Sequence, residues 1–143
     1  MLVIDTSVAV KWVVPENGDN IEDDTGLALD LLAYALIAPD CLVGEFANAM
    51  FRKVQAKEIG MAQAKASIDI LPDLITFLPT PVFVSAAFDL ALSIGHPIHD
   101  CLFLVTAMQH GHPLVTADRK FVARCRRGKI EYPVQPLSDG NWR

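Results

Sequence analysis

The stretch His96–Phe121 places a helix, a short strand and the start of a second helix in direct succession. Apolar residues recur at helical spacing over His99–His110, and the apolar run Pro113–Thr116 that follows predicts a buried strand. A carboxylate, Asp118, then opens the next predicted helix. This alternation favours an α/β fold with a mostly parallel sheet, in which strand carboxyl ends and helix starts share one rim where ligands bind.

The same alternation extends over the rest of the chain. Strands are expected at Leu2–Asp5, Leu74–Leu78 and Val134–Gln135, with an extended link or short strand at Ala38–Pro39. Helices are expected between Asp5 and Pro15, and at Ile21–Ile37, Cys41–Ala56, Met61–Leu71, Val84–Ile94 and Asp118–Arg127. The polar tail from Ser138 is expected to be frayed. The sequence therefore predicts one domain over residues 1–143, with a small and heavily covered sheet.

Charge is distributed unevenly along the chain. The net charge of −5 argues against binding nucleic acid by bulk electrostatics. However, six of the 12 lysines and arginines lie between Arg119 and Lys129, directly after Asp118, whereas acidic residues gather in Glu16–Asp24. The basic segment could hold a polyanion against an acidic centre, or it could be a solvated helix face.

Composition limits the location of the protein. The apolar fraction of 52% and the mean hydropathy of +0.31 fit either a dimer or partner interface or a dense core. The longest nearly uncharged run, Cys101–Met108, is far shorter than the ~20 residues of a membrane span, and no signal peptide is visible. The odd number of cysteines (three), without paired spacing, favours a reducing cytoplasm.

Three carboxylates stand at predicted helix starts. Asp5 follows the first strand, Asp100 lies at the start of the predicted helix His99–His110, and Asp118 follows a later strand. Each of them alone is adequately explained as a helix cap. Together they lie where an α/β sheet builds its ligand site.

Glu45 lies inside an apolar helical segment without a cation one turn away. A buried unpaired carboxylate costs several kcal/mol or takes up a proton, so Glu45 is either functional or on the exposed helix face. Gly44 costs ~1 kcal/mol in a helix relative to Ala and suggests close approach by backbone or ligand. Asn48, one turn further, could orient Glu45.

An oxygen-only set of Asp5, Glu45, Asp100 and Asp118 suits a hard cation, Mg²⁺ or Mn²⁺. Such an ion relieves the repulsion between carboxylates and can activate water at a phosphodiester. The rival is a zinc site made by the four histidines, which are His96, His99, His110 and His112. They lack a paired cysteine and flank loop ends, so turn or surface roles are favoured for them.

Four segments, MLVIDTSVAV, GEFANAM, IHDCLFLVTAMQHG and PLVTADRKF, together resemble the PIN domain, and within it the VapC toxins. The resemblance covers essentially the whole chain in order and spacing. It implies a three-layer α/β sandwich with four or five mostly parallel strands and helices on both faces. It also implies a Mg²⁺- or Mn²⁺-dependent endoribonuclease whose catalytic and metal ligands are Asp5, Glu45, Asp100 and Asp118.

Further roles follow from the same resemblance. Thr116, or else Ser7, would supply an auxiliary hydroxyl, and Arg119, Lys120 and Arg124 would draw in the RNA backbone. The resemblance implies a homodimer and a VapB-like antitoxin that lays an apolar segment in a groove. Trp12–Val14 would line that groove, although Trp12 could equally belong to the core.

Three other functions remain open at this level. A phospho-receiver also places acids at strand ends, but the helical Glu45 disfavours it. A non-catalytic RNA- or protein-binding module is disfavoured by four intact carboxylates. A housekeeping RNA-processing PIN nuclease is compatible with every residue named above, and only the absence of an added domain favours the toxin.

Overall fold

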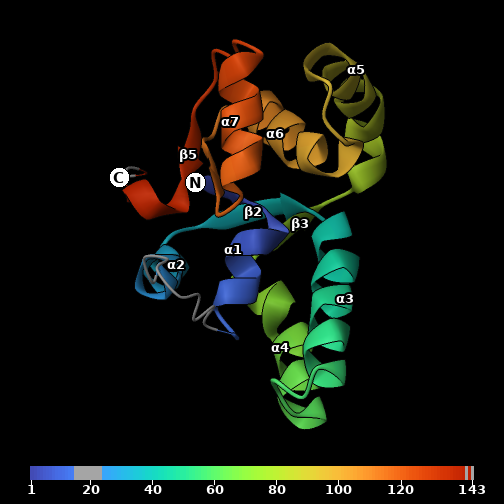
Figure 1. The fold of residues 1–143 in the computed structure, drawn as a ribbon, viewed down its shortest axis with the longest axis vertical. Helices are drawn as coiled ribbons and strands as arrows, with labels where there is room; N and C mark the ends of the chain where they lie inside the picture. The colour runs from blue at the N-terminus through green and yellow to red at the C-terminus, as the bar shows by residue number, and fades with distance from the viewer. Residues whose placement is uncertain (15–23, 141, 143) are drawn as a thin grey trace.

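The core of the fold is a five-stranded sheet in the order β3-β2-β1-β4-β5, in which every pairing is parallel. A computed structural model describes residues 1–14, 24–140 and 142 (Figure 1). The strands are β1 (Leu2–Ile4), β2 (Leu36–Pro39), β3 (Thr76–Leu78), β4 (Leu114–Thr116) and β5 (Val134–Pro136). The predicted α/β fold with a small parallel sheet is therefore confirmed.

Helices cover both faces of the sheet and complete the three layers (Figure 1). One layer contains α1 (Thr6–Lys11), α2 (Thr25–Asp30), α3 (Cys41–Gln55) and α4 (Met61–Leu74). The other contains α5 (Val84–Ile94), α6 (Ile98–His110) and α7 (Arg119–Arg127). Short 3-10 turns lie at Leu31–Ala33, Thr80–Phe83 and Leu137–Asp139. The helix α6 packs on β1, β2 and β4, so it is the central helix of its layer.

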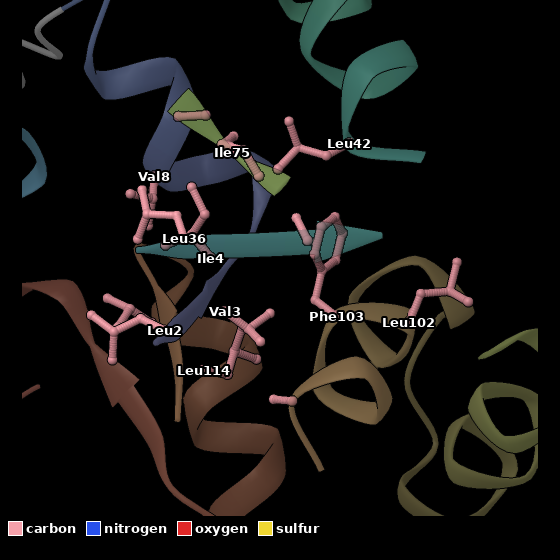
Figure 2. Close-up of a cluster of buried hydrophobic side chains, with 14 of the residues drawn as sticks. Leu2, Val3, Ile4, Val8, Leu36, Leu42, Ile75, Leu102, Phe103 and Leu114 are labelled. Carbon is pink, nitrogen blue, oxygen red and sulfur yellow. The ribbon is translucent and has the colours of Figure 1, made fainter. Parts of the chain in front are cut away.

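The strands are apolar because the helices bury both faces of the sheet. All residues of β1, β2 and β4 are buried, and β1 is the central strand. Figure 2 shows Leu42 and Ile75 on one side of β2 and Leu102 and Phe103 of α6 on the other. Phe103 is 1% exposed, so its ring is enclosed between α6 and the sheet.

Glycines stop two helices where the sequence predicted. Gly95 and Gly111 follow α5 and α6 with φ of 66° and 69°, a left-handed conformation that favours glycine. Each helix ends there, and the chain continues into α6 after Gly95 and into β4 after Gly111.

Three local predictions were wrong. The helix expected at Ile21–Ile37 is shorter, because Leu36 and Ile37 belong to β2, where pairing with β1 overrides their helical spacing. Helix α4 continues through Pro72 to Leu74. The tail from Ser138 is not simply frayed, because a 3-10 turn continues through Asp139 and Trp142 is buried.

Within the described residues, no single helix is both long and apolar enough to cross a membrane. Only the pair Thr80–Ile94 and Ile98–His110, bent by 116° at the break, reaches that length and apolarity together.

Candidate active site

The strand order changes direction at the junction of β1 and β4, and two of the predicted acids, Asp5 and Asp118, lie at that junction. From β1 the chain proceeds through β2 to β3 on one side, and it then crosses to β4 and β5 on the other. Such a switch point opens a crevice beyond the carboxyl ends of the two central strands. Asp5 directly follows β1, and Asp118 lies two residues beyond β4.

Asp5 is buried and held on several sides. It caps α1 by accepting a hydrogen bond from the Val8 N–H at 3.4 Å, and it also accepts hydrogen bonds from the hydroxyls of Ser7 and Thr116. Burial raises the pKa of Asp5 to about 7, although the hydrogen bonds from Ser7 and Thr116 oppose this shift. A cation placed beside Asp5 would favour its ionised form.

The Thr116 hydroxyl ties Asp5 to Asp118. It donates to Asp5 and accepts a hydrogen bond from the Asp118 N–H at 3.0 Å. The Asp118 carboxylate in turn caps α7, accepting from the N–H groups of Lys120 and Phe121 at 3.0 and 3.1 Å. Both hydroxyls predicted as auxiliary, those of Ser7 and Thr116, therefore lie against Asp5.

Glu45 reaches the rim from α3 and is half-buried. Its Oε1 accepts a hydrogen bond from the Thr6 hydroxyl at 3.1 Å, and its Oε2 is buried without a hydrogen-bond partner among the described residues. Burial raises the pKa of Glu45, while Thr6 and His99 lower it and the charge of Asp100 raises it further. Asn48 is exposed, and among the described residues the hydrogen bond to Glu45 comes from Thr6. An unpaired buried carboxylate oxygen is costly unless a ligand binds it.

Asp100 is not a helix cap, contrary to its simplest interpretation. Pro97 is the N-cap of α6, and Asp100 lies in the first turn. Its Oδ2 is 2.6 Å from Nε2 of His96. Its charge contributes to the raised pKa values of Asp5 and Glu45.

The rim opens into a groove of about 1220 Å³ between α1, α3 and the start of α7. Its described lining includes Glu45 and Asp118, the hydroxyl residues Thr6 and Ser7, and the cations Lys11, Arg52, Lys53, Arg119 and Lys120. Arg124, predicted to contact RNA, is not among the described residues that line it. Gly44 also lines the groove, and a Cβ at this position would meet nothing within 4 Å. The backbone close approach suggested for Gly44 is therefore absent from the described protein, and the space beside it is open to a ligand.

The four acids are not drawn together into a closed metal site. Among the described residues, no three His, Cys, Asp or Glu side chains form a group that could hold a metal ion. Their chemistry nevertheless fits a hard cation, because all the donor atoms are oxygens. One buried oxygen of Glu45 has no partner among the described residues, and burial raises the pKa values of Asp5 and Glu45. The zinc alternative is not supported, since His96 binds Asp100 and His110 contacts the Thr106 carbonyl.

Comparison with known families identifies the fold. The PIN domain family model matches residues 2–126. The chain belongs to the PIN domain family. No curated protein matches this chain.

Solved structures share the PIN fold at low sequence identity. PAE2754 from Pyrobaculum aerophilum is 17% identical with a TM-score of 0.67, covering 86% of this chain and 84% of its own. VapC20 from Mycobacterium tuberculosis, a sarcin-ricin loop cleaving toxin, is 16% identical with a TM-score of 0.65, covering 86% and 94%. VapBC2 from Rickettsia felis, bound to a DNA fragment from their promoter, is 15% identical with a TM-score of 0.60, covering 94% and 97%.

Sequence reasoning missed several residues of this PIN domain's rim. Thr6 follows Asp5 in the sequence and could have been noticed as a hydroxyl beside the predicted ligand. His96 lies four residues before Asp100. This spacing indicates a contact between the two side chains only if the chain turns between them. Arg52 and Lys53 lie two turns beyond Glu45, and only the helix geometry places them along the groove.

Trp12 donates its Nε1 hydrogen to the Ala28 carbonyl at 2.7 Å, and this hydrogen bond connects α1 to α2.

The acidic segment Glu16–Asp24 falls outside the described residues except for Asp24. That residue forms a buried ion pair with Lys11 at 2.8 Å, at the α1 end of the groove.

Proposed function

We propose that this PIN domain is a divalent-metal-dependent endoribonuclease and the toxin of a VapBC-type toxin–antitoxin pair. The observation that carries the proposal is geometric: the buried Oε2 of Glu45 has no hydrogen-bond partner among the described residues. Beside it on the rim, the Thr116 hydroxyl links Asp5 to Asp118. Membership of the PIN family and the fold shared with VapC toxins support the same activity. The proposed unit is a single domain over residues 1–143, working in the cytoplasm.

Asp5, Glu45, Asp100 and Asp118 would hold Mg²⁺ or Mn²⁺. The bound ion would activate a water for attack on an RNA phosphodiester and stabilise the departing oxyanion. Asp5 would release its proton as the cation binds, because a neighbouring positive charge lowers the pKa that burial has raised. Ser7 and Thr116 would hold Asp5 in place by donating to its two oxygens, and Thr6 would do the same for Glu45.

The groove supplies cations for a phosphate backbone on both sides of the acids. Arg119 and Lys120 lie on the α7 side, and Arg52 and Lys53 lie on α3. Lys53 is paired with Glu58 at 3.0 Å, so Arg52 is the stronger candidate of those two. Arg124 stays a proposed contact for RNA beyond the groove. Contact with several phosphates predicts binding that weakens steeply as salt is raised.

A VapB-like antitoxin would occupy the same groove and block access to the acids. We further propose a homodimer. Three exposed apolar residues, Val84, Phe88 and Leu92, recur four residues apart along α5, so they form one strip on the helix surface. Sedimentation of the wild type and of Leu92→Glu would test this: a lighter species is expected for the variant, and equal masses would exclude this strip as the contact.

The nuclease proposal is tested with purified protein, single-stranded RNA and Mg²⁺ or Mn²⁺. Cleavage is expected with either ion, and its loss is expected with a chelator. Asp100→Asn should lower the rate by on the order of 100-fold or more. Asp89→Asn is the matched control, because Asp89 is exposed on α5, in a different helix from the rim residues. Equal cleavage rates for the wild type and a folded Asp100→Asn variant would contradict the proposed mechanism.

The toxin role is tested separately from the chemistry. Expression of the wild type in a bacterial host without an antitoxin is expected to arrest growth, and expression of Asp100→Asn is not. Active enzyme that leaves growth unchanged would instead favour a housekeeping nuclease.

A further inference from the structure

His96 makes a close side-chain contact with Asp100. Its Nε2 lies 2.6 Å from Oδ2 of Asp100, and the two side chains are 14% and 30% exposed. Because a carboxylate can only accept, Nε2 carries the proton of this hydrogen bond. One oxygen of Asp100 is thereby engaged, and Oδ1 is the oxygen that remains for a cation.

The backbone around His96 fixes where the imidazole lies. Gly95 turns the chain with φ of 66° at the end of α5, and the His96 N–H donates to the Ala91 carbonyl at 3.1 Å. Pro97 then caps α6 with a restricted φ of −56°. The histidine therefore lies in a short, constrained connection between two helices, and its side chain is mostly buried.

The face of the His96 ring packs against a residue of the Asp118 turn. The ring centroids of His96 and Phe121 are 4.9 Å apart at an interplanar angle of 45°. Phe121 is fully buried, and its N–H donates to Oδ1 of Asp118 at 3.1 Å. One imidazole thus contacts Asp100 by a hydrogen bond and the cap of Asp118 by ring packing.

We propose that His96 is a positioning residue that sets the orientation of Asp100 relative to Asp118 and thereby the affinity of the rim for a divalent ion. This inference rests on the proposed function, because it assumes that both acids bind the ion. Hydrogen-bonding partners of metal ligands fix ligand orientation, and their loss typically costs about 10- to 100-fold in metal affinity. Asp100 has few other restraints, since it lies at a partly exposed helix start and caps nothing.

Two substitutions separate the two contacts of His96. His96→Phe keeps a ring against Phe121 and removes the donor to Asp100. His96→Gln keeps an N–H donor at a similar reach and removes the ring. His112→Ala is the control, because His112 is a half-buried histidine that follows Gly111 at the other end of α6.

The measurement is the Kd for Mn²⁺ alone, by calorimetry, on each full-length chain without RNA. His96→Phe is expected to weaken Mn²⁺ binding by about 10- to 100-fold, His96→Gln to recover most of that loss, and His112→Ala to match the wild type. Thermal melting without metal checks that every variant is folded, and a His96→Phe chain that fails to fold is replaced by His96→Leu, which also removes the donor to Asp100.

Each outcome decides something. If folded His96→Phe binds Mn²⁺ as well as the wild type does, or more tightly, His96 does not position Asp100 for the ion. If the wild type and His112→Ala also fail to bind Mn²⁺, the proposed metal-dependent function fails and the assignment of His96 fails with it. A loss in His96→Phe that His96→Gln largely restores, with His112→Ala unchanged, supports both proposals.

Discussion

Asp5 and Asp118 perform the same local task in different surroundings. Each caps a helix that starts just beyond one of the two central strands, and each accepts hydrogen bonds from backbone N–H groups of that helix. Asp5 is 4% exposed and has a pKa raised to about 7, whereas Asp118 is half-exposed and faces the groove. Two residues that both cap a helix therefore differ in burial, and burial raises the pKa of Asp5.

The largest expected effect separates the two acids by catalytic rate. Asp5→Asn should lower RNA cleavage by about 100- to 1000-fold, because no water can replace a ligand that is enclosed by protein. Asp118→Asn should cost less, roughly 10- to 100-fold, because water can reach its position. Rates at saturating Mn²⁺ test this, with Asp89→Asn as the control. A larger loss of cleavage rate for Asp118→Asn than for Asp5→Asn would show that the more exposed acid matters more for catalysis.

The second effect is on the pH dependence of stability. The pKa of Asp5 is raised on folding, so the folded state binds the proton more tightly than the unfolded state does. Without metal, its contribution is fully present below about pH 4 and is lost as pH rises to about 7, an effect of a few kcal/mol at most.

Urea unfolding of wild type and Asp5→Asn across that pH range isolates this contribution, because the other titrating groups are shared. The difference in unfolding free energy should fall with rising pH and level off above pH 7. A difference that is constant with pH would show that Asp5 does not take up a proton in the folded protein.

A third prediction concerns the hydroxyl that links the two caps. Thr116→Val removes a donor to Asp5 and the acceptor of the Asp118 N–H, so it should cost about 1 to 3 kcal/mol of unfolding free energy. Thr106→Val is a matched control, because Thr106 is equally buried but its hydroxyl bonds only the Leu102 carbonyl of its own helix. Equal losses for the two variants would mean that the link adds nothing beyond a buried hydroxyl.

The smallest effect concerns the cap of α7 alone. Asp118→Ala should destabilise the fold by about 1 kcal/mol, whereas Asp118→Asn should nearly preserve stability because asparagine also caps well. Both should lose cleavage activity. Thermal unfolding of the two metal-free variants distinguishes the capping role from the catalytic one. Equal melting temperatures would show that the cap of Asp118 does not contribute to stability.

The sequence was sufficient for much of the fold because local signals agreed with tertiary structure. The apolar stripe of Cys41–Ala56 and the glycine after Ile94 marked α3 and α5 almost to the residue. Prediction failed where pairing or packing overrode the local pattern. Leu36 and Ile37 continue a helical spacing but pair with β1, and Trp142 is buried although its neighbours are polar.

The candidate site was predictable in kind but not in detail. The positions of Asp5 and Asp118 followed from strand ends, since a parallel sheet aligns them at one rim. The contacts of Glu45 with Thr6 and of Asp100 with His96 depend on how α1, α3 and α6 approach one another. Sequence spacing carries almost no information on such contacts, and for that reason Asn48 was named in place of Thr6.

The strand order also sets when the site can exist. β1 is made first, yet its partners in the sheet are β2 and β4, and the Thr116 hydroxyl that binds Asp5 belongs to β4. Pairing between strands so distant in sequence is slow and waits for the later strand. A growing chain therefore carries Asp5 without Thr116 or Asp118 beside it until β4 and the start of α7 have been made. The proposed activity can arise only after that segment has left the ribosome and paired with β1.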